Sequence, residues 1–202
     1  MMKNNSENTR RDAILAAALP LFLENGYEKT SIRMISNKVG CEVGLVYYYF
    51  SAKDEIFENA LALYFNERRE ALEVLTEKTK TDATRFVSEL FDYLEKESES
   101  FHTTFSGRVH WTIRTAVRGK LASLLCPCFE IIAKQLKEEI RPPYPADLAA
   151  KSASDVIAQA AFHEDAEYFK KHRDDLKRIL NHLLGTDNRY SSRRREIPSF
   201  LL

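Results

Sequence analysis

Cysteine and histidine are the residues of this chain that could bind a metal or carry out redox chemistry, but the spacing of the cysteines does not favour a metal site. Cys126 and Cys128 flank Pro127 and supply only half of the four ligands of a structural zinc site. The third cysteine, Cys41, lies far from both, and an odd count argues against a disulfide framework. We therefore expect ordinary reduced thiols, with metal binding or thiol sensing by Cys126 and Cys128 as the alternative.

The histidines are too dispersed for a metal site or a catalytic group. No two of them form a His-x-x-x-His pair, and the chain has no Gly-rich phosphate loop, no nucleophile elbow and no His-Glu metal motif. They are His102, His110, His163, His172 and His182. We expect no metal, no cofactor and no enzymatic activity; a helical hydrolase or transferase without a familiar motif is the alternative.

A run of tyrosines followed by a lysine is compatible with a different chemistry, contact with nucleic acid, although such rings taken alone are more often part of a core. A tyrosine ring packs against a sugar or a thymine methyl while its hydroxyl donates to a phosphate oxygen. Neighbouring helix positions lie about 100° apart. We therefore expect Phe50 in the core, Tyr47 and Tyr48 facing outward, and Tyr49 at the edge, with Lys53 behind them. Core packing of these rings is the alternative.

Charge adds little to this interpretation. The chain has 30 Lys and Arg against 30 Asp and Glu, and its formal net charge is zero. Within residues 1–55 seven basic residues match seven acidic ones, and a surplus occurs only between Asn25 and Lys53, where four basic residues outnumber two acidic ones. DNA binding must therefore rest on a local site and not on the overall charge.

The composition predicts an all-α globular protein. Hydrophobic residues make up 44% of the chain and charged residues 30%, while six Gly and six Pro leave room for long helices. No apolar run approaches the ~20 residues that cross a bilayer, and the polar residues 1–12 lack the apolar core of a secretory signal. We expect a cytoplasmic protein without membrane contact.

Three helices and a long fourth are expected to position the tyrosines. Gly26 and Gly40 should end the first two, Thr30 or Ser31 should cap the second, and Pro20 should kink the first. Two short helices across a glycine-containing turn are typical of a helix-turn-helix. The expected ranges of the first three helices are Arg10–Asn25, Ile32–Val39 and Val43–Phe50. The fourth helix should begin at a capping box formed by Ser51 and Asp54 and run to about Glu77.

The rest of the chain is also predicted to be helical. A helix capped by Thr81 or Asp82 should run through Leu94, and Pro127 should bend or split a later one. The last helix has apolar residues near heptad spacing and should end at Gly185. The later ranges are Phe101–Leu125, Leu121–Ile140, Ala146–Phe162 and Asp165–Leu184, and the apolar residues of the last are Phe169, Leu176, Leu180 and Leu183.

Several short motifs occur in order in the first quarter of the chain. They are Gly26-Tyr27, Thr30-Ser31, Val39-Gly40, the cluster Gly44-Leu45-Val46-Tyr47-Tyr48-Tyr49-Phe50, and Lys53. Over about Arg10 to Leu61 this frame resembles the N-terminal domain of the tetracycline-repressor (TetR) family.

The resemblance implies a DNA-binding domain over 8–53, a helical effector-binding and dimerisation domain over 54–186, and a tail over 187–202. It also implies a homodimeric regulator, in most cases a repressor, that binds a pseudo-palindromic double-stranded operator and is released by a small-molecule effector.

The resemblance also assigns site residues. The third helix would enter the major groove, while residues of the second helix and Lys53 would approach phosphates; Arg33 would also read guanine. The DNA-contacting residues would be Thr30, Ser31, Arg33, Val43, Gly44, Leu45, Tyr47, Tyr48, Tyr49 and Lys53. Glu42 departs from the family pattern: its carboxylate either weakens DNA binding or caps the third helix.

Aromatic and polar residues downstream could line an effector pocket, because such pockets are mostly apolar with a few polar anchors. They are Phe101, His102, Phe105, His110, Trp111, Arg114 and Phe129. Plain core packing is the alternative. Arg193–Arg195 are expected to form a solvated tail, with contact to DNA or a partner subunit as the alternative. A helical interaction protein that has lost DNA binding is the rival function.

Overall fold

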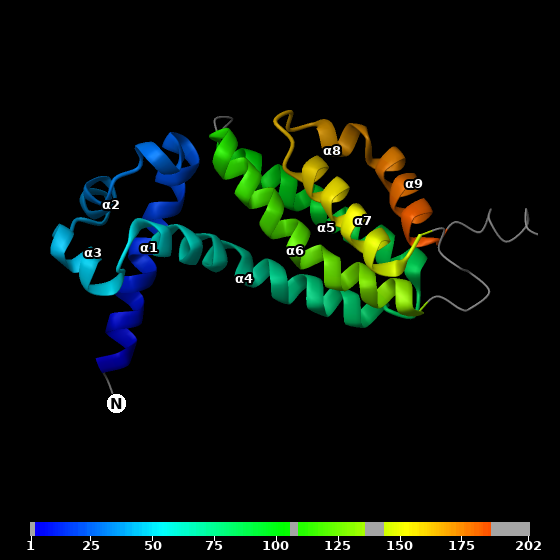
Figure 1. The fold of residues 1–202 in the computed structure, drawn as a ribbon, viewed down its shortest axis with the longest axis horizontal. Helices are drawn as coiled ribbons and strands as arrows, with labels where there is room; N and C mark the ends of the chain where they lie inside the picture. The colour runs from blue at the N-terminus through cyan, green and yellow to red at the C-terminus, as the bar shows by residue number, and fades with distance from the viewer. Residues whose placement is uncertain (1–2, 106–108, 136–143, 187–202) are drawn as a thin grey trace, which may run out of the picture. The chain divides into compact units, whose positions relative to one another are not determined.

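The computed structural model describes residues 3–105, 109–135 and 144–186, and every regular element in these ranges is a helix (Figure 1). The helices are α1 (Lys3–Lys29), α2 (Ile32–Val39), α3 (Val43–Tyr49), α4 (Lys53–Thr79), α5 (Ala83–Thr104), α6 (Trp111–Gln135), α7 (Ala146–Ala161), α8 (Tyr168–Lys171) and α9 (Arg173–Leu184). The all-α prediction is therefore confirmed. None of these helices combines the length and the apolar character needed to cross a bilayer.

The chain forms two compact units. The first comprises Met1–Arg68 and Ser100–Lys120, and the second comprises Arg69–Glu99 and Leu121–Leu202. The first unit is thus larger than the expected DNA-binding domain, because it extends along α4 and includes the end of α5 and the start of α6. The expected tail, 187–202 with Arg193–Arg195, lies outside the described residues.

The core of the first unit is built on α1. Ile14, Ala18 and Phe22 are fully buried at the i, i+4 and i+8 positions of a single helix face. The helix continues through Pro20, and its non-helical residue is Gly26, at φ 79° and ψ 166°. The interruption of α1 therefore lies at Gly26, where the sequence predicted the first helix to end, and Pro20 does not divide the helix.

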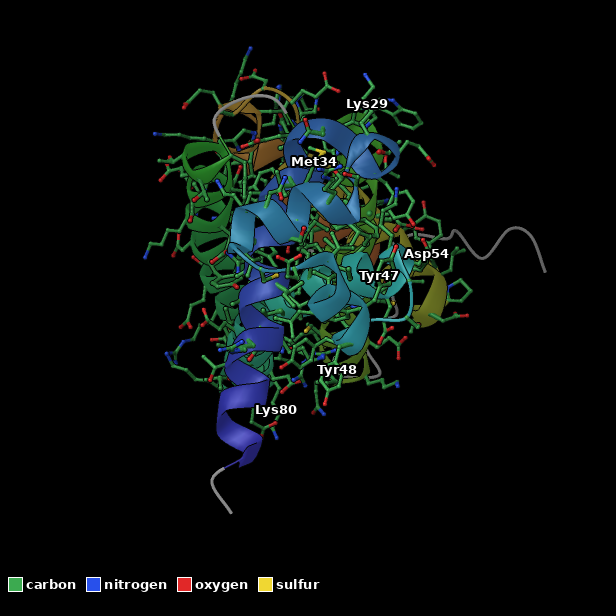
Figure 2. The ribbon with its side chains drawn as sticks, turned by 90° about the vertical axis from the view of Figure 1, so that its left-hand side faces the viewer. Lys29, Met34, Tyr47, Tyr48, Asp54 and Lys80 are labelled. Carbon is green, nitrogen blue, oxygen red and sulfur yellow. The ribbon has the colours of Figure 1, made fainter. Side chains whose placement is uncertain are left out.

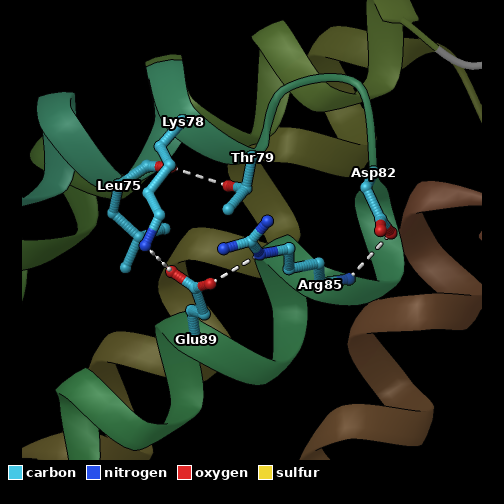
Figure 3. Close-up of polar contacts among 6 residues, drawn as sticks. All are labelled: Leu75, Lys78, Thr79, Asp82, Arg85 and Glu89. Atoms are coloured by element: carbon cyan, nitrogen blue, oxygen red, sulfur yellow. Dashed lines mark hydrogen bonds and ion pairs between the residues drawn. The ribbon is translucent and has the colours of Figure 1, made fainter.

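In the second unit, the turn between α4 and α5 is closed by side chains (Figure 3). The Thr79 hydroxyl donates to Leu75 O at 2.7 Å, and Asp82 Oδ1 accepts from Arg85 N at 3.0 Å. The predicted cap at Asp82 is therefore confirmed. Arg85 also donates to Glu89 at 2.7 Å, and this hydrogen bond lowers the pKa of the Glu89 carboxyl.

Two predictions about the later helices need correction. Of the bend or split expected at Pro127, the split does not occur, because Pro127 lies inside the continuous helix α6. The single helix expected over Asp165–Leu184 is instead divided into α8 and α9, because His172 between them has non-helical angles of φ −104° and ψ 13°. The next residue, Arg173, is the first residue of α9 and pairs with Asp92 and Glu95 of α5.

α7 and α9 lie side by side (Figure 1). The near-heptad residues Leu176 and Leu180 are buried, as is Phe169 of α8, whereas Leu183 is half-buried. Most of this stripe therefore belongs to the core of the chain's own unit. α9 ends at Gly185, which has left-handed angles of φ 74° and ψ 18°, as the sequence predicts.

Candidate nucleic-acid interface

α2, its following turn and α3 form the predicted helix-turn-helix. The hydroxyl of Ser31 accepts from Met34 N at 3.2 Å and so caps α2. Gly40 ends α2 in the left-handed conformation, at φ 75° and ψ 38°, and its N–H donates to Asn37 O at 3.2 Å. Only glycine adopts this backbone without a steric penalty, so the local sequence alone fixes the sharp turn into α3.

α3 has one buried side and one exposed side. Val46 and the following Phe50 are buried, with exposed fractions of 0% and 1%. Tyr47 and Tyr48 are 55% and 70% exposed, and Figure 2 shows both on the face turned to the viewer. Tyr49 is half-buried, and its ring lies edge-on to that of Tyr48 at 5.0 Å. These orientations are the ones that the helical spacing predicts.

The start of α3 offers little hydrogen-bonding chemistry. Val43 and Leu45 are half-buried, and Gly44 is exposed with open space around it. Glu42 occupies the N-cap position, but its side chain makes no capping hydrogen bond and is exposed. The capping role considered for Glu42 is therefore not what this structure shows, and a carboxylate lies at the edge of the expected DNA-facing surface.

Ser31 and Arg33 are exposed on α2, whereas Thr30 is not. The Thr30 side chain is 0% exposed, and its hydroxyl lies 3.0 Å from Leu21 O and 2.9 Å from Gly26 O. Thr30 therefore satisfies carbonyls of α1 inside the unit. The Thr30 side chain has no exposed surface with which it could make the phosphate contact that the sequence predicted.

Lys53 is also tied to α1. Its ammonium nitrogen donates to Tyr27 O at 2.9 Å and lies 4.2 Å from the centre of the Tyr27 ring. That ring packs in turn against Phe22 and Phe57, with centroids 5.8 and 5.5 Å away. A lysine ammonium has three N–H donors, so the bond to Tyr27 leaves Lys53 able to reach a phosphate as well. The structure thus gives Lys53 a positioning role that sequence reasoning missed.

The N-terminus of α4 is held by Glu55 and not by the predicted Asp54. Glu55 Oε2 accepts from the backbone N–H of Ser51 at 2.7 Å and from its hydroxyl at 2.8 Å. The backbone bond from Ser51 is the main reason why the pKa of the Glu55 carboxyl is lowered. Because the cap orients the first turn of α4, it also orients Lys53 in that turn.

Within the first unit, Arg11 of α1 contacts both α4 and the residue that follows α3. Its guanidinium donates to Asn59 Oδ1 on α4 at 2.8 Å and lies 5.0 Å from the centre of the Phe50 ring, just after α3. No sequence motif singles out Arg11, since its partners lie about 40 to 50 positions away.

The structure divides the residues that the sequence proposed for an effector pocket. Phe129 lies in the second unit and packs against Phe86, with centroids 6.0 Å apart. The other six lie in the first unit: Phe101, His102, Phe105, His110, Trp111 and Arg114. Phe101 and Arg114 are buried, whereas Trp111 is 69% exposed. None of these seven residues lines the small cavity that lies between α5 and α8 in the second unit.

The cysteines show no special arrangement. Cys128 is buried, its thiol donates to Leu124 O at 3.3 Å, and burial raises its pKa. A raised pKa keeps the thiol protonated and unreactive. Within the described residues, no three His, Cys, Asp or Glu side chains are grouped as a metal site would need.

Thr30→Val should lower stability without altering any contact to phosphate. The change keeps the shape but removes the one O–H that is shared between the carbonyls of Leu21 and Gly26. The Leu21 carbonyl keeps the Asn25 amide as a donor at 2.9 Å, and the free energy of unfolding should fall by about 1–3 kcal/mol. Urea denaturation measures this. For comparison, Ser31→Ala removes an exposed cap worth about 1 kcal/mol. A Thr30→Val protein of normal stability that binds DNA with a reduced salt dependence would instead place Thr30 at the phosphates.

The chain is similar to known bacterial regulatory proteins. Residues 14–60 match the family described as bacterial regulatory proteins, tetR family. Over 71 residues the chain is 39% identical to the HTH-type transcriptional regulator HbdR of an Aromatoleum strain, covering 33% of this chain and 31% of HbdR. Over 131 residues it is 24% identical to the HTH-type transcriptional activator FasR of Mycolicibacterium smegmatis, covering 62% of this chain and 59% of FasR. The matches thus span less than two thirds of either relative.

The fold is also similar to a solved structure. NalD, the secondary repressor of the MexAB-OprM multidrug efflux pump in Pseudomonas aeruginosa, matches with a TM-score of 0.56 and 21% identity. The match covers 88% of this chain and 96% of NalD. At this identity the likeness describes the fold: an N-terminal helix-turn-helix followed by a helical C-terminal part.

Proposed function

Because residues 14–60 match the tetR family of bacterial regulatory proteins, we propose that this chain is a member of that family and a cytoplasmic, ligand-responsive transcriptional regulator that binds double-stranded DNA as a homodimer. The observation that carries the proposal is the exposed pair Tyr47 and Tyr48 on a short helix that follows a left-handed glycine turn. Adjacent exposed rings of this size are typical of an interaction surface.

The proposed interface is the exposed side of α3 with the N-terminal part of α2. Tyr47 and the apolar edge of α3 contact bases and thymine methyls, and Arg33 reaches a phosphate or a guanine. Thr30 acts from inside the unit. The proposed contact residues are therefore Ser31, Arg33, Val43, Gly44, Leu45, Tyr47, Tyr48, Tyr49 and Lys53.

The proposed dimer uses α7 and α9. Leu148 and Val156, eight positions apart on α7, are 54% and 38% exposed, and Ile179 on α9 is 43% exposed. Because α7 and α9 pack side by side, these residues are suited to a face that a second copy covers. Dimerisation would place two recognition helices about 34–36 Å apart, so the operator is a pseudo-palindrome.

The proposed regulation is release from DNA by a small-molecule effector bound in the helical C-terminal part. Effector binding would tilt α4 and change the spacing of the two recognition helices. The relatives include both a regulator named as an activator and one named as a repressor. Repression is the proposed outcome here, and a reporter gene fused to the selected operator decides between the two.

The experiment is selection of duplexes from a random 30-bp library by the full-length protein. With a selected duplex, Arg33→Ala should weaken binding and reduce the magnitude of the salt slope by about 0.9 for each phosphate that the protein no longer neutralises. Tyr47→Phe, which removes only the hydroxyl, should weaken binding while the protein stays folded and dimeric. The matched control is Arg85→Ala, which removes an exposed arginine of α5 in the second unit and should leave the affinity and the salt slope unchanged.

The rival function is a helical interaction protein that has lost DNA binding. Its sequence support is the neutral charge and the carboxylate of Glu42. Failure of the wild-type protein to enrich any duplex at low salt would support that rival and overturn the proposal. Equal binding by wild type, Arg33→Ala and Tyr47→Phe would overturn the proposed interface alone.

A further inference from the structure

The break in α1 at Gly26 leaves backbone carbonyls that other elements bind. A non-helical residue interrupts the regular bonding of a helix and leaves carbonyl acceptors for other donors. The Thr30 hydroxyl bonds to Leu21 O and Gly26 O, and the Lys53 ammonium donates to Tyr27 O. The carbonyl of Leu23 accepts from the backbone N–H of His110 at 2.8 Å. Donors from three places in the chain therefore converge on residues 21–27 of α1.

His110 makes a second, steric contact at the same place. A Cβ atom added to Gly26 would lie 2.8 Å from both Cγ and Nδ1 of the His110 ring. The ring thus occupies the space that the missing side chain of Gly26 leaves open. His110 is separated from Gly26 by more than 80 positions, so the contact exists only in the folded chain.

His110 is also the residue from which α6 starts. Its carbonyl accepts from Ile113 N and Arg114 N, each at 3.0 Å. Its Nδ1 lies 3.4 Å from Thr112 N and 2.8 Å from the Thr112 hydroxyl, which is the pattern of an N-cap. The first residue before α6 is therefore anchored both to its own helix and to α1.

α6 runs from the first unit into the second, since the boundary falls between Lys120 and Leu121. The segment Ser100–Lys120 belongs to the unit that holds the helix-turn-helix. A shift of the start of α6 would act on Gly26 directly, and the turn after Gly26 contains both Tyr27, which holds Lys53, and the cap of α2.

We propose that His110 is a positioning residue for DNA binding, which holds the break in α1 and thereby sets α2 and Lys53. This inference rests on the proposed function. The ring of His110 against Gly26 fixes the α1–α2 turn, and the N–H bond to Leu23 holds the start of α6 to the same turn. DNA affinity then depends on where α6 begins, through a contact separate from α4.

Two substitutions separate this role from simple capping. His110→Asn keeps a side chain that caps helices well but removes the ring from Gly26. His110→Phe keeps a ring against Gly26 but cannot cap. If His110 has the positioning role, His110→Asn should lower the affinity for DNA on the order of tenfold. The affinity of His110→Phe should stay within about threefold of that of the wild type. A purely capping role predicts the reverse order.

The measurement uses full-length protein, the duplex selected by the wild type, and two readouts. Fluorescence anisotropy gives the affinity. The emission of Trp111, the single tryptophan of the chain, reports the junction itself, because its ring lies 6.0 Å from that of His110. Its emission should change when DNA binds to the wild type and to His110→Phe, and should respond less in His110→Asn.

A control separates positioning from loss of stability. Arg173→Met removes the ion pairs of Arg173 with Asp92 and Glu95 in the second unit. When Arg173→Met loses as much stability in urea as His110→Asn, its affinity for DNA should still equal that of the wild type. Wild-type affinity in His110→Asn, or an equal loss in Arg173→Met, would overturn the inference while leaving the proposed function intact. Failure of the wild type to select any duplex would overturn both.

Discussion

Gly26→Ala is expected to destabilise the protein by about 3 kcal/mol or more, because two penalties act at one residue. Gly26 has φ 79° and ψ 166°, a region that is essentially restricted to glycine. The new methyl group would also lie 2.8 Å from two atoms of the His110 ring. DNA affinity should fall with stability, because the same residue sets the turn into α2. Urea denaturation and anisotropy with the selected duplex measure the two effects.

Gly40→Ala is the matched control for this prediction. Gly40 also has a positive φ, 75°, but an added Cβ meets nothing within 4 Å. Gly40→Ala should therefore lower the free energy of unfolding only by the penalty of placing alanine in the left-handed conformation, about 1–2 kcal/mol. Adding His110→Ala to Gly26→Ala should recover the steric part of the loss only. Equal losses in the two alanine proteins, with no recovery in the double variant, would show that the His110 ring does not crowd Gly26.

Val156→Asp is expected to separate the proposed dimer into monomers. The substitution places a charge on the exposed side of α7, where a partner would bury it without an opposite charge. A monomer presents one recognition helix to a two-part operator, so affinity should fall about 10²-fold or more. Analytical ultracentrifugation gives the oligomeric state, and anisotropy gives the affinity.

The control for the dimer prediction is Val74→Asp. Val74 is 69% exposed on α4 in the second unit, so an aspartate there is solvated at little cost. This protein should remain dimeric and bind normally. If Val156→Asp also remains dimeric, then the α7 and α9 face is not the one that joins the two copies.

The helix-turn-helix could be predicted closely because its determinants are local. Ser31 caps α2 and Gly40 ends it, and both act through backbone groups within a few positions. Consecutive residues of a helix are rotated by about 100° around its axis. Once the helix is placed, this rotation directs Tyr47 and Tyr48 outward and Phe50 into the core. Local capping and periodicity are properties of the sequence itself, so they need no knowledge of distant residues.

Other features could not be predicted, because each depends on a partner that only folding brings near. The sequence assigned Thr30 to phosphate, yet the fold turns its hydroxyl inward. It placed His110 in a possible effector pocket, yet the fold brings its ring to Gly26. It predicted one helix where Arg173, paired with α5, begins a new one.

The sequence by itself therefore determined that the chain is helical, where α3 begins, and which side of that helix is exposed. These properties come from short-range hydrogen bonding and from the period of the helix. Only the tertiary structure decided which donors meet the carbonyls of α1 near Gly26, because Thr30, Lys53 and His110 come from separate parts of the chain. An unsatisfied carbonyl has no preferred partner until the fold places a donor beside it.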